Sequence, residues 1–280
     1  MSTVTITAAE VNKLRQRTGA GMMDCKKALT EANGDMEKAI DILREKGQKV
    51  AMNRSDRQAK EGSVLAKISA DGKKATITVL NCETDFVSRN QEFIDASEKI
   101  AEIAINGNYN SLDELKAAPF GGGLSVEQKV VELIGKTGEK MELSLYEFVK
   151  GEKVFAYNHP GNRLASVVAF SKAEANNLNE TGKEIAMQIA AMAPIAVDKD
   201  DVTKETADRE MQVAKEQARQ EGKPEEMLEK IAQGKLNKFY KECTLLNQEY
   251  IKDSKKTVRQ FLQDSDKELK ITGFKRAAIG

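Results

Sequence analysis

The chain has 280 residues and carries 44 Lys plus Arg against 44 Asp plus Glu, so its formal net charge is zero. A chain of this length is too long for one small core, which favours two or more folded units. The balanced charge argues against direct binding of nucleic acid, because such binders normally carry a basic excess that replaces the counterions of phosphates.

Residues 1–47 are predicted to form three short helices. The first helix begins at a capping box made by Thr7 and Glu10. Asp35 caps the third helix, whose apolar residues repeat at helical spacing until Gly47. Three helices of this size favour a small bundle of the ubiquitin-associated type that folds independently.

Residues 48–60 are predicted to be a linker, because they are polar and show no apolar period. The densest basic run of the chain lies here and consists of Lys46, Lys49, Arg54, Arg57 and Lys60. Asp56 interrupts this run, and a solvated linker explains it better than a track of phosphate contacts. The N-terminal unit and its linker are therefore assigned to residues 1–54.

A β-hairpin followed by a helix is predicted next, and this unit is assigned to residues 55–145 as the first half of a core. Its two strands cover residues 63–69 and 75–81, with a tight Asp-Gly turn between them. An amphipathic helix follows Phe86. The segment after that helix, residues 106–124, is predicted to be rich in loops and ends near three consecutive glycines, residues 121–123.

The same pattern recurs in residues 146–200, the predicted second half of the core. Strands are predicted at residues 143–149, 153–157 and 163–170, and a helix at residues 181–192. The runs Lys-Ile-Ala-Glu-Ile-Ala and Glu-Ile-Ala-Met-Gln-Ile in the two helices resemble each other. This echo favours a duplicated unit of antiparallel sheet and helix.

Residues 201–253 are predicted to form an antiparallel helical hairpin of the coiled-coil kind. The segment breaks once, where Gly222 ends one helix and Pro224 starts the next. A two-helix hairpin is too thin to hold a core, so such an arm usually projects and contacts something. Residues 254–280 close the chain with a helix and a strand that returns to the second sheet. The predicted fold class is α+β.

The run from Thr84 to Val87 is the most informative stretch for function. It follows an apolar, β-rich segment, so a strand delivers an acid and a bulky aromatic ring to the start of a helix. Asp85 and Phe86 are adjacent, and on neither regular period can both side chains lie on one buried face. Phe86 is therefore a candidate wedge for another protein. The alternative is a core Phe behind a capping Asp, which is the commoner explanation for an isolated Asp-Phe pair.

No standard catalytic or cofactor-binding motif is found. The run Gly135-Lys136-Thr137 lacks the earlier glycine of a phosphate-binding loop, because that position is Val130. His159 is the only histidine, and the three cysteines are too scattered for a zinc site: Cys25, Cys82 and Cys243. We predict that the chain is not an enzyme and that it binds no metal, cofactor or nucleotide itself.

The sequence also predicts a cytoplasmic protein without membrane contacts. The first residues, Met1 to Thr5, lack the basic and apolar regions of a signal peptide. No apolar run approaches the length that spans a membrane. An odd number of cysteines without a Cys-x-x-Cys pair fits a reducing compartment.

Two segments resemble the signatures of a known family. The run Leu-Arg-Gln-Arg-Thr-Gly-Ala-Gly-Met-Met-Asp-Cys-Lys-Lys-Ala-Leu, from Leu14 to Leu29, is similar to the N-terminal signature of bacterial elongation factor Ts. The run Asn-Cys-Glu-Thr-Asp-Phe-Val, residues 81–87, resembles the second signature of that family. Both runs are long and specific, they follow the order and spacing of the family, and the resemblance covers essentially all 280 residues.

The resemblance implies a guanine nucleotide exchange factor that promotes GDP release from the translation GTPase elongation factor Tu. The aromatic wedge of the family corresponds to Phe86 and its acid to Asp85, while Thr84 and Val87 complete the motif. The wedge is implied to insert between helices of the partner's nucleotide domain, close to its bound Mg²⁺. The arm is also implied to touch the partner. Further implied contact residues are Arg15, Met22, Met23, Ile134, Gly135 and His159.

Structural alternatives stay open for several of these residues. His159 is alternatively a turn residue with a satisfied ring, and Ile134 is alternatively a core residue. For Met22 and Met23 the alternative is that one is buried and one exposed. A second function from a different class is a nonenzymatic scaffold, in which the ubiquitin-associated-like domain and the arm bind peptides. A GDP-release assay separates the two functions.

Overall fold

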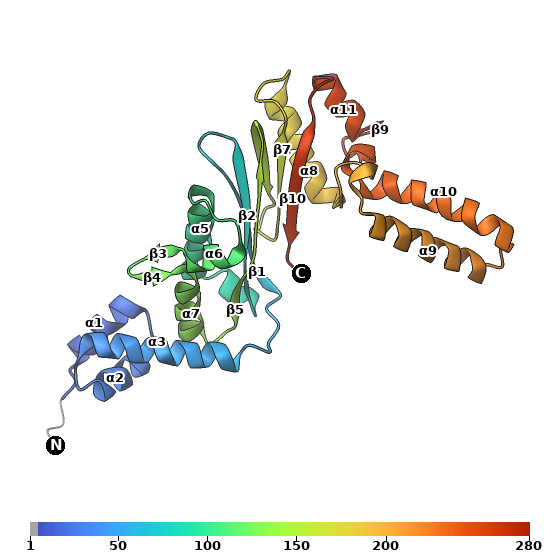
Figure 1. The fold of residues 1–280 in the computed structure, drawn as a ribbon. Coiled ribbons are helices and arrows are strands. Elements are labelled where there is room, and N and C mark those ends of the chain that lie inside the picture. The colour runs from blue at the N-terminus through green and yellow to red at the C-terminus, as the bar shows by residue number, and fades with distance from the viewer. Residues whose placement is uncertain (1–4) are drawn as a thin grey trace.

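The computed structural model describes residues 5–280 and confirms the α+β class (Figure 1). A three-helix N-terminal unit lies at one end, two antiparallel sheets with their covering helices form the centre, and a pair of long helices projects from the other side. Met1 to Val4, where the sequence predicts no signal peptide, lie outside the described residues. Between residues 5 and 280, no helix combines the length and the apolar character needed to cross a membrane.

The N-terminal unit consists of α1 (Ala8–Thr18), α2 (Met22–Glu31) and α3 (Met36–Asn53). The predicted capping box is confirmed, because Glu10 N donates to Thr7 Oγ1 over 3.3 Å and Thr7 N donates to the Glu10 carboxylate over 2.8 Å. The buried apolar residues of this unit form a cluster of their own: Val11, Leu14, Cys25, Ala28, Leu29, Ala32 and Ala39.

Helix α3 runs on through Gly47, so the predicted linker is wrong for residues 48–53. Gly47 does not end the helix, because it lies where α3 crosses α7 (Val126–Thr137) closely. Beyond this crossing, Val50 and Ala51 pack against the apolar cluster of the first sheet. Two apolar residues are too few to give residues 48–53 a helical period, and the sequence of this segment therefore resembles that of a linker.

The centre of the molecule holds two three-stranded antiparallel sheets. The strand order is β1-β2-β5 in the first sheet and β10-β7-β6 in the second, so in each sheet a third strand pairs with the second strand of a hairpin. The two sheets therefore share one topology. The strands are β1 Glu61–Ile68, β2 Lys74–Cys82, β5 Met141–Lys150, β6 Lys153–Asn158, β7 Leu164–Phe170 and β10 Ile271–Ala278.

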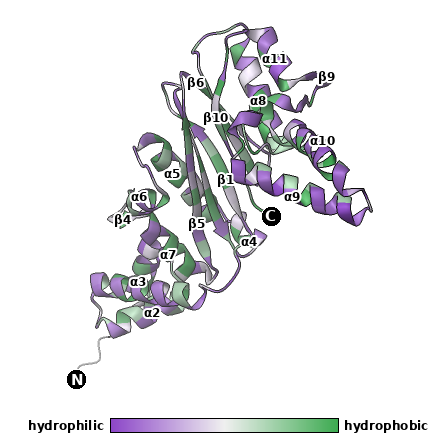
Figure 2. Cartoon of the chain, turned by 45° about the vertical axis from the view of Figure 1, so that its right-hand side comes forward, coloured by the Kyte–Doolittle hydropathy of each residue, from purple (hydrophilic) through white to green (hydrophobic). Residues whose placement is uncertain are grey.

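The two sheets are the inner layers of a four-layer core (Figures 1 and 2). Helix α5 (Gln91–Asn106) covers the first sheet, and α8 (Leu178–Met192) covers the second. Strand β2 alternates accordingly, because Ile77 and Val79 belong to the apolar cluster between the sheets, whereas Leu80 belongs to the cluster under α5. Apolar residues at alternate positions thus bury both faces of this strand.

Two predictions for the first half of the core need correction. Residues 106–124 contain a helix, α6 (Leu112–Ala117), and a short hairpin of β3 (Pro119–Gly121) with β4 (Leu124–Ser125). The predicted division between residues 145 and 146 falls inside β5, which pairs with β2 in the first sheet. Helix α6 has a local signal, because Ser111 caps it by accepting from Glu114 N over 3.2 Å. The place of β5 in the first sheet depends instead on its pairing with the distant β2, which local propensity does not reveal.

Helices α9 (Lys204–Gln220) and α10 (Glu225–Cys243) pack against each other and project from the second sheet (Figure 1). We call this pair the arm. Figure 2 shows that many of its residues are hydrophilic. The buried residues between its helices are Ala214, Ala218, Leu228, Ala232 and Leu236. The remaining elements around its base are η1 Lys199–Asp201, η2 Leu245–Asn247, β8 Glu249–Tyr250, β9 Asp253–Thr257 and α11 Val258–Ser265.

A glycine in α8 tests how closely this helix packs on the second sheet. A Cβ atom on Gly182 would lie 2.1 Å from Phe155 Cδ2. The Phe155 ring is buried and packs edge-on against Phe170 at a centroid distance of 5.7 Å, so it has no room to move aside. We expect Gly182→Ala to lower the free energy of unfolding by about 1–3 kcal/mol, as overpacking does.

The matched control is Gly234, which is exposed in α10 and has open space around it. Gly234→Ala should raise the free energy of unfolding by roughly 0.5–1 kcal/mol, because alanine loses less backbone entropy in a helix. Urea unfolding curves measure both variants. Two changes of the same sign would contradict the close contact between α8 and β6.

Candidate functional site

The segment from Thr84 to Val87 lies where β2 ends and α4 (Asp85–Ser88) begins. Thr84 is extended, and its Oγ1 accepts a hydrogen bond from Val87 N over 3.4 Å, which caps the single turn of α4. Asn90 then caps α5. Figure 2 shows α4 at the end of the sheets that lies away from α11. The predicted strand-to-helix junction is therefore confirmed.

The Phe86 side chain projects from this junction into solvent. It is 84% exposed, more than any other large apolar residue between residues 5 and 280. The neighbouring Val87 instead packs against the cluster of the first sheet. Asp85 forms a 3.1 Å ion pair with Arg89 on the surface of α4. The alternative that Phe86 is a core residue is wrong, and we call this exposed side chain on α4 the wedge.

Two glutamates connect the junction to the loop between α7 and β5. Glu139 accepts from Thr84 N over 3.1 Å and from Thr84 Oγ1 over 2.7 Å. In the opposite direction, Glu83 accepts a 2.6 Å hydrogen bond from Lys140 N. Burial opposes ionisation of Glu83, but the Lys140 amide and two nearby arginines outweigh it and lower the pKa of its carboxyl. Glu83 is therefore ionised at neutral pH.

A buried thiol lies directly behind the wedge. Cys82 is fully buried, and its Sγ donates to the Thr84 carbonyl oxygen over 3.2 Å. Burial, with the negative charges of Glu139 and Glu61, raises the pKa of this thiol to about 12. Because the thiolate is the reactive form, Cys82 is unreactive as long as the junction stays closed.

The turn between β6 and β7 lies beside α4. Val64 N, in β1, donates to Asn162 O over 2.7 Å, and Arg163 binds the Glu61 carboxylate at the start of the same strand. The hydrogen bond to Glu61 raises the pKa of Arg163, and the charge of Asp85 adds to this effect. The guanidinium group thus connects β1, the turn and the acidic residue of α4.

His159 stands exposed in the same turn. Its backbone N donates to Leu164 O over 2.9 Å, and its Nδ1 lies 2.9 Å from Tyr157 Oη. The ring is thus both partnered and accessible, so the geometry is compatible with a turn residue and with a contact residue. The fold brings His159 to the end of the sheets where the wedge lies, although the two are far apart in the sequence.

The three N-terminal candidates form a separate surface on α1 and α2. Met22 is 54% and Met23 is 63% exposed, so the alternative that one of them is buried is wrong. Arg15 is also exposed, in the last turn of α1. Helix α3 spans 18 residues, or about 27 Å at 1.5 Å per residue. It runs from this surface to the first sheet, where Arg54 at its end lies 3.7 Å from Glu83.

Ile134 lies inside the fold, and Gly135 is half-buried where α3 crosses α7. Ile134 is 4% exposed and belongs to the cluster of the first sheet. A Cβ atom on Gly135 would lie 3.1 Å from the Cα atom of Gly47, so this glycine permits the close crossing of α3 and α7. Burial therefore supports the packing explanation for Ile134 and gives Gly135 a structural role as well.

The site also contains Glu83, Glu139 and Arg163. Glu83 lies inside the motif of residues 81–87, directly before the capping Thr84, whereas no motif points to Glu139 or Arg163. Glu139 is 55 residues away from Thr84, and Arg163 is 102 residues away from Glu61. Only the pairing of β2 with β5 and the packing of the two sheets bring these groups together.

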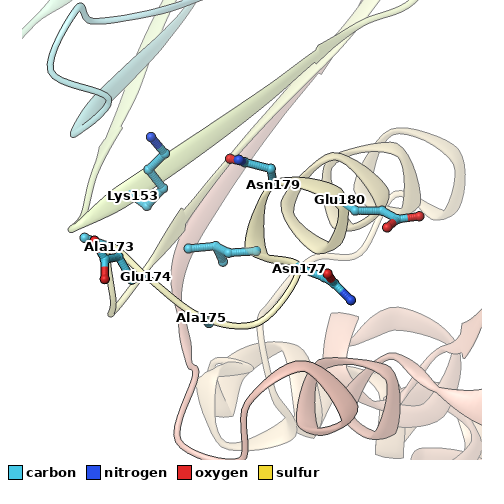
Figure 3. Close-up of a pocket in the computed structure, with 8 residues that line it drawn as sticks. Lys153, Ala173, Glu174, Ala175, Asn177, Asn179 and Glu180 are labelled. Carbon is cyan, nitrogen blue, oxygen red and sulfur yellow. The ribbon is translucent and has the colours of Figure 1, made fainter.

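A cavity of about 450 Å³ lies elsewhere, next to the start of α8 (Figure 3). Its lining side chains do not converge on one point, because Asn177 and Glu180 point away from Lys153 in Figure 3. Among residues 5–280, no group of three or more His, Cys, Asp and Glu residues is placed to hold a metal ion. The candidate site is accordingly the exposed contact surface around the wedge.

Comparisons with known proteins agree on one family. The family model described as elongation factor TS matches residues 83–280. The chain is 50% identical to elongation factor Ts of Cytophaga hutchinsonii over 275 residues, which cover 98% of this chain and 99% of the relative. It is 48% identical to elongation factor Ts of Flavobacterium psychrophilum over 276 residues, with 99% of both chains covered. The protein of the same name from Bacteroides thetaiotaomicron is 41% identical, with 98% of both chains covered.

Proposed function

The chain belongs to the elongation factor Ts family of translation elongation factors, and we propose on this basis that it is a guanine nucleotide exchange factor for elongation factor Tu. It promotes GDP release so that GTP can bind during polypeptide elongation. It acts in the cytoplasm by contact alone, so it is not an enzyme and binds no nucleotide itself.

The observation that carries this proposal is the 84% exposure of Phe86 on α4. We propose that the ring inserts between helices of the partner's nucleotide domain and, with Asp85, disturbs the groups around its bound Mg²⁺. Thr84 and Val87 hold the ring in place from either side. Burying one Phe contributes roughly 1.5–3 kcal/mol, which corresponds to one or two decades of affinity at about 1.4 kcal/mol each.

The wedge therefore needs support from further contacts. Exchange means that the factor and GDP weaken each other's binding to the GTPase, and this coupling is reciprocal. We propose that Arg15, Met22 and Met23 on the N-terminal unit, His159 beside the wedge, and the arm supply these contacts. Ile134 and Gly135 act from inside, by holding α7 against the sheet and α3.

The proposed domains follow the parts of the fold. Residues 1–54 form the ubiquitin-associated-like unit, residues 201–253 the helical hairpin arm, and residues 254–280 the return to the core. The two halves of the duplicated core lie between them, and we place their boundary after β5, at Lys150, instead of between residues 145 and 146.

Elongation factor Tu loaded with a fluorescent GDP analogue tests the function directly. Substoichiometric amounts of the chain should accelerate release of the analogue into excess GTP. In parallel, calorimetry of the purified chain with GDP or GTP should detect no binding, because the run Gly135-Lys136-Thr137 belongs to α7 and lacks the earlier glycine that phosphate binding needs at Val130. Unchanged release at saturating factor would favour the peptide-binding scaffold, and tight nucleotide binding would contradict the proposed mode of action.

A further inference from the structure

The wedge lies on a helix that is too short to be stable without support from other parts of the chain. Helix α4 has four residues, far below the ~12–15 residues at which an isolated helix becomes even marginally stable in water. None of its residues is fully buried, and Val87 is the one apolar side chain of α4 that packs against the cluster of the first sheet. Groups outside α4 must therefore supply much of what fixes the orientation of Phe86.

Two carboxylates supply that support in a crossed arrangement. Glu139 accepts from both Thr84 N and Thr84 Oγ1, and Glu83 accepts from Lys140 N. Each glutamate thus binds the backbone next to the other one. The Thr84 hydroxyl in turn accepts from Val87 N and caps α4. Hydrogen bonds to ionised groups are shorter and stronger than neutral ones, which suits them to fix a short turn.

We propose that Glu83 and Glu139 are positioning residues that hold the wedge in its binding orientation. This inference rests on the proposed exchange function and extends it from the ring to the groups behind it. A wedge that is already ordered loses less conformational entropy when it enters a partner. Loss of the crossed pair should therefore weaken exchange although neither carboxylate touches the partner.

Glu83 also connects the wedge to the N-terminal unit. Its carboxylate lies 3.1 Å from Arg57 and 3.7 Å from Arg54, at the end of α3. Its side chain is 14% exposed, whereas the Asp85–Arg89 pair on the outer side of α4 is largely exposed. Shielding from water makes the Glu83 contacts the more effective of the two. The N-terminal unit thus supports the wedge indirectly, in addition to the contacts proposed for its own surface.

Four variants of the full chain test the Glu139 side of the pair. Glu139→Ala should slow the saturating rate of GDP release roughly tenfold, the size expected for loss of hydrogen bonds to a charged group. Thr84→Val removes the hydroxyl and should have a similar effect, and the double variant should be no slower than the slower single one, because the two residues act as one unit. Glu139→Gln should recover most of the rate, since its amide oxygen can accept from Thr84 N and its amide can donate to the hydroxyl.

Cys82 provides a readout that does not depend on exchange. Its thiol is buried behind Thr84, so alkylation of Cys82, followed by peptide mass spectrometry, reports whether the junction opens. Glu139→Ala and Thr84→Val should raise its alkylation rate at least tenfold, while Cys25, buried in the N-terminal unit, stays protected. Protection of Cys25 and an unchanged melting curve distinguish a loosened junction from general unfolding.

Glu142→Ala is the matched control, because the Glu142 side chain is half exposed on β5 and its carboxylate forms a 3.8 Å ion pair with the Lys140 side chain. It should change neither GDP release nor Cys82 alkylation. The proposal is overturned if Glu139→Ala and Thr84→Val release GDP as fast as the unaltered chain while Phe86→Ala is slow. If the unaltered chain does not accelerate GDP release, the proposed exchange function itself fails. If it does and Phe86→Ala is equally fast, the role of Phe86 fails, and this inference fails with it.

Discussion

Replacing Phe86 with Ala is expected to leave the melting temperature nearly unchanged and to slow GDP release from elongation factor Tu at least about tenfold. The ring is 84% exposed, so its removal leaves no cavity, whereas the same change in a core costs about 3–5 kcal/mol. Burial of the ring in a partner would contribute roughly 1.5–3 kcal/mol. This corresponds to about one to two decades in the coupling between the factor and GDP on the GTPase.

A melting curve and a stopped-flow trace with fluorescent GDP measure the two effects separately. Phe93→Ala is the matched control, because Phe93 is 1% exposed in the adjacent helix α5. It should lower the melting temperature strongly and leave release per folded molecule much less affected. The interpretation of Phe86 would be wrong if its own removal lowered the melting temperature by many degrees with release per folded molecule unchanged.

The adjacency of Asp85 and Phe86 predicts that one of the two is exposed, because neither helical nor strand geometry can bury both. Adjacency does not decide which one, and the exposure of Phe86 itself follows only from the resemblance of residues 81–87 to the second signature of the family. Capping residues such as Thr7 and Asp35 located helix starts for a similar reason, because a cap satisfies amides of its own first turn. Each of these arguments needs only contacts between residues a few positions apart.

Helix α7 carries local sequence signals at both of its ends. Ser125 and Gln128 form a capping box at its start, and Gly138 ends it with a φ of 73°. The residues Gly135-Lys136-Thr137 drew attention as an incomplete phosphate-binding loop, although they are the last turn of this helix. The caps at Ser125 and Gly138 mark both ends of α7 in the sequence.

Contacts between distant segments could not be predicted in this way. Gly47 has the appearance of a helix end, yet the close approach of α7 is what requires a residue without a side chain there. The role of Glu139 depends on the register of β5 against β2, which places residues 139 and 140 beside residues 83 and 84. Strand register is a property of the folded sheet, and a single segment does not specify it.

Deleting residues 1–54 is expected to weaken binding to the GTPase at least about tenfold and also to destabilise the remaining chain. The binding loss follows from removal of the N-terminal surface with Arg15, Met22 and Met23, at one decade per ~1.4 kcal/mol. The destabilisation follows from the loss of Val50 and Ala51, which pack against the cluster of the first sheet. Exposing a side chain such as that of Val costs about 1.5–3 kcal/mol.

Deletion of residues 1–34 separates the two effects, because it removes α1 and α2 but keeps α3 with Val50, Ala51 and Arg54. Both truncated chains should need higher concentrations than the full chain for half-maximal GDP release. The core should melt several degrees lower after deletion of residues 1–54 than after deletion of residues 1–34, at roughly 2–4 °C per kcal/mol for a chain of this size. Equal melting of the two cores would restore the linker interpretation of residues 48–53. Unchanged half-maximal concentrations would exclude the N-terminal surface from binding, and the wedge and the arm would then have to account for the whole interaction.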